Sequence, residues 1–281
     1  MTSTLLYTIL ILSGLGALLA IILYVVAQKF KVFEDPLIDQ VQQVLPGANC
    51  GGCGSAGCHA FAESCVKAES LDGRFCPVGG NQVMAKVAEV LGKTVAQQEP
   101  RVAVLRCAGT CEVRGKSSVY DGLSTCAAEA ALYGGDSTCA YGCLGLGDCA
   151  AACSFGAISV DPALGIAVVD EEKCTSCGSC VKACPKGLLE LRPKGPKNRR
   201  VYVACSNKDK GFLAKKACKA ACIGCCACVK ACPFEAVTVT DFLAYIDPAK
   251  CRMCRKCVAV CPSGGIKEVN FPPKKEVKQD E

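Results

Sequence analysis

Tryptophan is absent from the 281-residue sequence, histidine occurs once, and aromatic side chains make up only 6% of the residues. The single histidine, His59, leaves little material for general acid–base catalysis. The sequence also lacks a GxGxxG fingerprint, a P-loop and a Ser/His/Asp set. We therefore expect no catalytic residue in this chain. The shortage of large side chains predicts a thin core, which bound metal centres would help to fold.

Charged side chains are absent before Lys29, where the sequence reads "MTSTLLYTILILSGLGALLAIILYVVAQ". A run of ~25 apolar or small residues is long enough to span a lipid bilayer, and the missing basic n-region argues against a cleaved signal peptide. The sequence predicts a transmembrane helix over 1–28. Because Lys29 and Lys31 follow it, the positive-inside rule predicts a single-pass protein of the plasma membrane, with the remaining residues in the cytoplasm.

Cysteine is abundant, with 27 residues, many of them in C-x2-C and C-x3-C runs. Such close neighbours are poor disulfide partners but good joint ligands of one metal centre, which indicates a reducing compartment. The net charge of +6 favours an acidic partner or an anionic membrane surface. We expect no nucleic-acid partner, because the sequence has no recognition motif and no basic stripe interleaved with aromatic residues.

Two runs near the C-terminus, "CIGCCACVKACP" and "CRMCRKCVAVCP", match the ferredoxin pattern C-x2-C-x2-C-x3-C-P. In two-cluster ferredoxins the fourth cysteine of each run ligates the cluster of the other run. The crossed pairing predicts cluster 4 on Cys222, Cys225, Cys228 and Cys261, and cluster 5 on Cys232, Cys251, Cys254 and Cys257. Zinc is the alternative, since C-x2-C pairs also bind it, but the full four-cysteine runs favour iron–sulfur clusters.

An earlier pair consists of "CAYGCLGLGDCAAACS" and the complete run "CTSCGSCVKACP". Leu146 stands in the first run where a ligand is expected, and we predict that Cys139 replaces it. The pairing then predicts cluster 2 on Cys139, Cys143, Cys149 and Cys184, and cluster 3 on Cys153, Cys174, Cys177 and Cys180. An internal repeat places Cys139 opposite Cys218, so Cys218 is an alternative to Cys225 in cluster 4, although the undistorted run favours Cys225.

The block "CGGCGSAGC" with "CPVGG" downstream suits a single cluster 1, on Cys50, Cys53, Cys58 and Cys76. The prediction is therefore five 4Fe–4S clusters. Seven cysteines remain: Cys65, Cys107, Cys111, Cys126, Cys205, Cys218 and Cys226. We interpret Cys65 and Cys226 as small apolar residues. Cys107 and Cys205 fall at matching places in the repeat, which suggests a structural role at a strand end; alternatively, Cys107, Cys111 and Cys126 belong to a sixth centre.

The predicted fold class is α+β, with an N-terminal transmembrane helix, a small four-cysteine 4Fe–4S domain and two bacterial-type ferredoxin-like domains of two clusters each. Asp35 and Pro36 predict a helix start, and "RVAVLRC" and "RVYVAC" have the alternation of strands. The expected boundaries are the transmembrane helix at 1–28, the 4Fe–4S domain at 29–98, a connecting segment at 99–136, the first ferredoxin-like domain at 137–192, a basic linker and strand at 193–215, the second ferredoxin-like domain at 216–270, and a disordered tail at 271–281.

The chain resembles the B subunits of Rnf ion-translocating electron-transport complexes in its N-terminal segment, "PGANCGGCGSAGCHAFAESC", "CPVGG" and "YGCLGLGDCAAACSFGAI". The extra ferredoxin pair resembles the longer form found within that family. The resemblance implies that the chain accepts electrons from reduced ferredoxin and relays them to other subunits, in a complex that couples electron flow to NAD with Na⁺ or H⁺ translocation. It implies a translocase as a complex, with no bond-making site in this chain.

The residues by themselves indicate only a membrane-anchored electron carrier with several clusters. The alternatives are a relay subunit of another membrane oxidoreductase and a redox-sensing or sensor-reducing module. Ferredoxins are generally acidic, so basic residues are candidates for steering their docking. The candidates are Arg252, Arg255, Lys256 and the segment 192–200.

Overall fold

The computed structural model describes residues 2–29, 35–132 and 134–272, and the first of these ranges forms helix α1 (Thr2–Lys29). Within these residues, no helix is both long and apolar enough to cross a membrane. The predicted transmembrane helix over 1–28 is therefore wrong, and the single-pass arrangement built on it is not confirmed. Lys31 and most of the expected disordered tail (273–281) lie outside the described residues.

Three helices, α2 (Pro36–Val44), α3 (Cys58–Lys67) and α4 (Gly80–Leu91), form the unit that follows. Asp35 caps α2 by accepting a hydrogen bond from the Leu37 amide at 2.9 Å, as Asp35–Pro36 predicted. The helices bury Val41, Phe61 and Met84 in a common core. The loops between the helices carry the first cysteine block.

The rest of the chain consists of two halves with the same order of elements, mixing helix and strand. The first half contains β1 (Arg101–Leu105), α5 (Cys126–Ala131), α6 (Asp148–Ala151), β2 (Ile158–Asp161), β3 (Ile166–Val169), α7 (Ser179–Ala183) and β4 (Leu189–Pro193). The second contains β5 (Arg200–Val203), α8 (Gly211–Ala217), α9 (Ala227–Ala231), β6 (Val237–Thr240), β7 (Leu243–Ile246), α10 (Lys256–Ala259) and β8 (Ile266–Val269). In each half the first and last strands pair antiparallel, as do the two middle strands.

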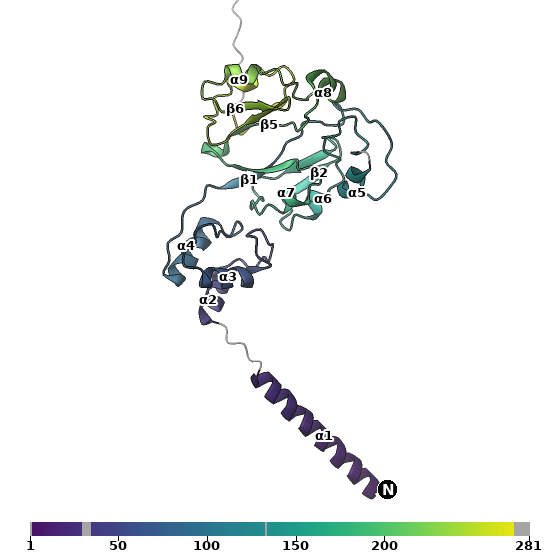
Figure 1. The fold of residues 1–281 in the computed structure, drawn as a ribbon, viewed down its shortest axis with the longest axis vertical. Coiled ribbons are helices and arrows are strands. Elements are labelled where there is room, and N and C mark those ends of the chain that lie inside the picture. The colour runs from purple at the N-terminus through teal and green to yellow at the C-terminus, as the bar shows by residue number, and fades with distance from the viewer. Residues whose placement is uncertain (1, 30–34, 133, 273–281) are drawn as a thin grey trace, which may run out of the picture.

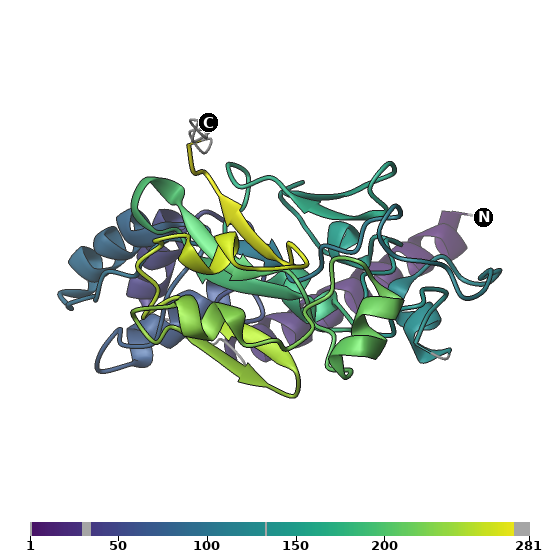
Figure 2. The same cartoon turned by 90° about the horizontal axis from the view of Figure 1, so that it is seen from above.

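Figure 1 shows the helical unit, the first half and the second half following one another along the long axis of the molecule. Figure 2 looks down on the second half, coloured green to yellow, which lies in front of part of the teal first half. The halves are joined by backbone hydrogen bonds, among them Ala108 N to Ala204 O at 2.8 Å and Lys219 N to Val113 O at 2.9 Å. The two halves therefore pack directly against each other and form one body.

The segment between the halves is short and ordered, with only the 3-10 turn η1 (Pro196–Asn198) between β4 and β5. Arg192 is 2% exposed and Arg200 5% exposed. The Arg192 guanidinium lies over the Tyr245 ring, 5.0 Å from its centroid, and so packs β4 against the second half. These two arginines are therefore structural and do not present charge to a docking partner.

Candidate iron–sulfur centres

The cysteines of the two halves line small cavities in sets of four. Among the described residues, no group of three or more His, Cys, Asp or Glu side chains is arranged to hold a single metal ion. The thiols instead line small cavities, one next to α9 and one next to α6. A set of thiols that surrounds a space of this kind suits a 4Fe–4S cluster.

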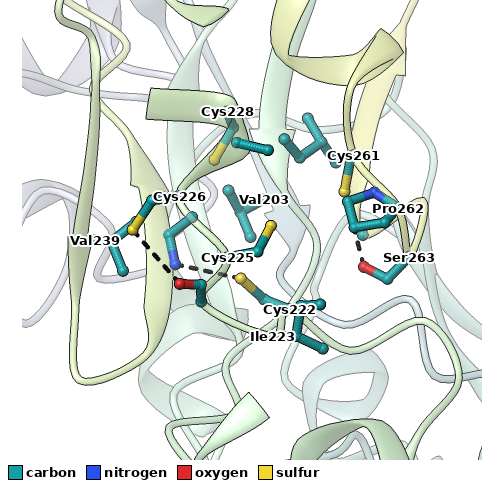
Figure 3. Close-up of a pocket in the computed structure, with 15 residues that line it drawn as sticks. Val203, Cys222, Ile223, Cys225, Cys226, Cys228, Val239, Cys261, Pro262 and Ser263 are labelled. Carbon is teal, nitrogen blue, oxygen red and sulfur yellow. Dashed lines mark hydrogen bonds between the residues drawn. The ribbon is translucent and has the colours of Figure 1, made fainter. Parts of the chain in front are cut away.

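The cavity at α9 is lined by the four cysteines predicted for cluster 4: Cys222, Cys225, Cys228 and Cys261 (Figure 3). Val203, Val239 and Ile266 close it with apolar surface. The Ala244 amide donates to Cys222 Sγ at 3.5 Å. Of the two alternatives for this set, Cys225 lines the cavity and Cys218 lies elsewhere.

Cys226 also borders this cavity, at the residue that precedes α9. Its thiol donates to the carbonyl oxygen of Gly224 at 3.5 Å, so it is turned toward the backbone (Figure 3). Its backbone is left-handed, with φ of 58°.

The set predicted for cluster 5 comes together around Cys257, the second residue of α10. Burial raises the pKa of the Cys257 thiol to about 12, and the nearby Cys251, Cys254 and Cys232 thiols raise it further. Buried thiols of this kind keep their protons at neutral pH unless a metal centre replaces them. Cys228 also acts on Cys257, which places the two sets of this half next to each other.

The set predicted for cluster 3 lines one cavity in the first half: Cys153, Cys174, Cys177 and Cys180. Burial raises the pKa of the Cys180 thiol to about 11, with a smaller contribution from the other three thiols. The amide of Ala103 in β1 donates to Cys174 Sγ at 3.5 Å. The crossed pattern read from the sequence thus corresponds to neighbouring thiols.

The set predicted for cluster 2 differs from the arrangement in the structure at one position. Cys143, Cys149 and Cys184 line one cavity, and the fourth cysteine there is Cys126, the first residue of α5. Cys139 lines a different cavity. Burial raises the pKa of the Cys149 thiol to about 12, and Cys126 is among the thiols that add to this rise.

Asp148 holds Cys126 at this cavity. Its two carboxylate oxygens accept hydrogen bonds from the Cys126 and Ala127 amides, at 2.8 and 2.9 Å. Thr125 caps the same helix by accepting from Ala128 N at 3.2 Å. The sequence signal for this arrangement is Thr125, a helix-capping residue directly before Cys126.

The set predicted for cluster 1 lies in the helical unit. Cys53 and Cys58 are close enough to Cys76 to raise the pKa of its thiol, although burial is the larger cause. The Gly79 amide donates to Cys76 Sγ at 3.4 Å. Cys50 is half-buried in the same loop as Cys53. Outside the set, Cys65 is fully buried in the helical core, as its interpretation as an apolar residue predicted.

Comparison with known proteins gives consistent matches along the chain. Residues 138–188 and 221–265 match the 4Fe-4S dicluster domain family, and residues 45–78 match the family described as "Putative Fe-S cluster". The B subunit of the Na(+)-translocating ferredoxin:NAD(+) oxidoreductase complex of Acetobacterium woodii is 46% identical over 257 residues, which cover 91% of this chain and 75% of the relative. The B subunit of the ion-translocating oxidoreductase complex of Methanosarcina acetivorans is 42% identical over 266 residues, covering 95% and 99%.

A third relative is the B subunit of the proton-translocating ferredoxin:NAD(+) oxidoreductase complex of Clostridium ljungdahlii, 40% identical over 269 residues, which cover 95% of this chain and 93% of the relative. The chain belongs to this family of B subunits. The family resemblance read from the sequence is thus confirmed. The two dicluster matches also coincide with the two halves of the structure that carry the cysteine cavities.

Proposed function

We propose that the chain is the electron-relay subunit of an ion-translocating ferredoxin:NAD oxidoreductase complex. It takes single electrons from reduced ferredoxin and passes them to other subunits, while the complex moves Na⁺ or H⁺ across a membrane. The observation that carries the proposal is that each of the two like-folded halves gathers cysteine sets, three of which line cavities, with Cys228 of one set close to Cys257 of the next in the second half. A row of redox centres is what a relay needs, whereas a catalytic pocket is not required.

The proposed ligands are the cysteine sets described above. Cluster 1 takes Cys50, Cys53, Cys58 and Cys76; cluster 2 takes Cys126, Cys143, Cys149 and Cys184; cluster 3 takes Cys153, Cys174, Cys177 and Cys180; cluster 4 takes Cys222, Cys225, Cys228 and Cys261; cluster 5 takes Cys232, Cys251, Cys254 and Cys257. A bound 4Fe–4S cluster supplies reversible one-electron chemistry. The residues around it supply thiolates, amide hydrogen bonds to sulfur and apolar walls that keep water away.

Ferredoxin docks, in this proposal, beside the exposed Cys254 of cluster 5. Lys250, Arg252 and Lys256 surround Cys254 in the sequence and are exposed, whereas Arg255 is paired with Glu268. Positive charge at an exposed redox site attracts an acidic partner and raises its association rate.

Charge reversal tests this docking surface. The double substitution Arg252→Glu/Lys256→Glu should slow ferredoxin oxidation about tenfold at low salt. The difference should shrink as salt is raised, because surface charges are screened beyond ~10 Å at 0.1 M. Lys86→Glu, on an exposed position of α4, changes the charge far from Cys254 and should leave the rate unaltered. An equal effect of both variants would contradict docking at cluster 5.

The proposed cellular location is a membrane, because ion translocation requires one. We place the cysteine-rich domains on its cytoplasmic side, where thiols stay reduced. In membranes from cells that lack this chain, ferredoxin-dependent NAD reduction and the coupled ion uptake should both be lost. They should return with the wild-type chain and with a Cys111→Ser chain, since Cys111 is in none of the proposed sets. Retention of both activities in the deletion strain would overturn the proposal.

A further inference from the structure

Four cysteines from the two halves of the molecule line one more cavity: Cys107, Cys139, Cys205 and Cys218. The set predicted for cluster 3 likewise lines a cavity with four cysteines. Cys139, Cys205 and Cys218 are buried, and Cys107 is half-buried. Cys107 and Cys218 also affect each other electrostatically, as do Cys218 and Cys139, and Cys205 and Cys107. The four thiols thus line one cavity and are linked one after another, Cys205 to Cys107, Cys107 to Cys218 and Cys218 to Cys139.

We propose that these four thiols bind a sixth 4Fe–4S cluster, which lies between the two dicluster halves. The proposal replaces the interpretation of Cys107 and Cys205 as structural residues at strand ends. It also replaces the sixth centre considered from the sequence, because Cys126 lines the cavity on α6 and Cys111 is exposed.

Each half contributes an equivalent pair of thiols. Cys107 and Cys205 follow the first strand of their halves, β1 and β5. The internal repeat likewise aligns Cys139 with Cys218. The hydrogen bonds repeat as well: Cys143 N donates to Cys107 Sγ at 3.4 Å, and Cys222 N donates to Cys205 Sγ at 3.3 Å. Two halves with the same local fold therefore turn the same two thiols toward each other.

The surroundings of the four thiols are those of an anionic iron–sulfur site. Asn207, which is 0% exposed, donates from its Nδ2 to Cys139 Sγ at 3.4 Å. Gly109 brings the backbone close, since a Cβ built on it would stand 3.4 Å from Cys107 Sγ and 3.5 Å from Cys218 Sγ. Hydrogen bonds to sulfur and close backbone approach both stabilise cluster ligands.

Arg114 lines the same cavity, and its Nη1 atom is buried without a hydrogen-bond partner. Its Nη2 atom donates to Gly165 O at 3.0 Å, which fixes the guanidinium in place. A buried cationic group without a partner is costly unless an anion faces it. A cluster held by four thiolates carries net negative charge and would supply that anion.

The position of the site makes it a bridge. Cys107 is hydrogen-bonded to Cys143, which belongs to the cluster 2 set, and Cys205 to Cys222, which belongs to the cluster 4 set. An electron that arrives from one half reduces the sixth cluster. The cluster is oxidised again when that electron passes to the other half, and no bond is broken. This bridging role rests on the proposed relay function, but the cluster itself does not.

Iron and acid-labile sulfide per chain test the cluster directly. The full chain, reconstituted without oxygen, should hold about 24 of each, since each cubane contains four. The double variant Cys107→Ser/Cys205→Ser should lose about four of each, together with one electron paramagnetic resonance signal. The control Cys65→Ala/Cys111→Ala removes two cysteines outside the six sets and should lose none.

About 20 iron atoms in the wild-type chain, or zinc held there in place of iron, would overturn the inference, as would unchanged iron in the double variant. If the double variant does not fold, the native mass of the wild-type chain decides the matter, because six clusters and five differ by one cluster mass. None of these measurements depends on NAD reduction. Failure of the sixth cluster is therefore distinguishable from failure of the proposed function.

Discussion

The backbone of Gly52 lies directly against Cys177. A Cβ built on Gly52 would stand 2.8 Å from Cys177 Cβ and 2.9 Å from Cys177 O. Gly52 lies between the Cys50 and Cys53 ligands proposed for cluster 1, and Cys177 is a proposed ligand of cluster 3. The contact therefore joins the helical unit to the first half at the point where an electron would pass between them.

The substitution Gly52→Ala should push the helical unit away from the first half. Overpacking of this kind costs about 1–3 kcal/mol, and the contact has no flexible side-chain end that could yield. We expect faster hydrogen exchange in residues 172–178 and slower electron transfer between clusters 1 and 3 after flash reduction. Gly16→Ala, whose Cβ meets nothing within 4 Å, is the control. Unchanged exchange in both variants would contradict this interface.

Cys126→Ser should remove or weaken the cluster held with Cys143, Cys149 and Cys184, with a loss of about four iron atoms per chain. The reason is that Cys126 supplies the fourth thiol of that cavity. Iron analysis and electron paramagnetic resonance of the reduced chain measure the effect. Cys111→Ser, also in the first half and exposed, should retain all iron. Full iron content in the Cys126 variant would return the fourth ligand role to Cys139.

Asn207→Ala should lower the reduction potential of the proposed sixth cluster without removing it. The substitution takes away the hydrogen bond from Asn207 Nδ2 to Cys139 Sγ, and such bonds stabilise the more negative, reduced cluster. A net hydrogen-bond contribution of ~1 kcal/mol corresponds to a shift of roughly 40 mV for one electron. Redox titration of the individual signals measures it. A shift in every signal, or in none, would argue against the assignment.

Cys226→Gly should stabilise the second half by about 1 kcal/mol, because Cys226 has a left-handed backbone that costs a residue with a Cβ about that much. The equivalent position before α6 is Gly147, with φ of 89°. Denaturant-induced loss of the cluster absorbance should therefore occur at higher denaturant in Cys226→Gly and at lower denaturant in Gly147→Ala. Loss of iron in Cys226→Gly would instead identify Cys226 as a ligand.

The sequence predicted the parts of the sites that local spacing controls. The four-cysteine runs around Cys222 and Cys251 bring their thiols together within the second dicluster half, and the run around Cys174 does so within the first, so a repeat pattern is sufficient to group them. The ligand roles of Cys126 and Cys205 were not predicted from the sequence, because the cysteines they meet lie outside their own local runs. Their positions depend on how Asp148 anchors α5 and on how the two halves pack, and neither is encoded in spacing.

The N-terminal prediction rested on a long apolar run without charged side chains, followed by Lys29 and Lys31, and it is wrong for the described residues. The basic segment 192–200 was also misread in part. Arg192 and Arg200 have the sequence appearance of an exposed linker, but aromatic rings and carboxylates from both halves bury them, among them Glu171, which is paired with Arg200. A run of basic residues in a sequence indicates solvent exposure only where the fold brings no aromatic ring or carboxylate against those side chains.

The matched thiol pairs of the central cavity also give the contact between the two halves an internal symmetry. A centre that receives the same two cysteines from each of two like-folded units is the arrangement of a twofold-symmetric homodimer, whose contact surface is identical on both copies. Here both units lie in one polypeptide, joined by the short turn at Pro196–Asn198. The contact between the two halves is therefore isologous in form, as in a homodimer, but it is held inside a single chain.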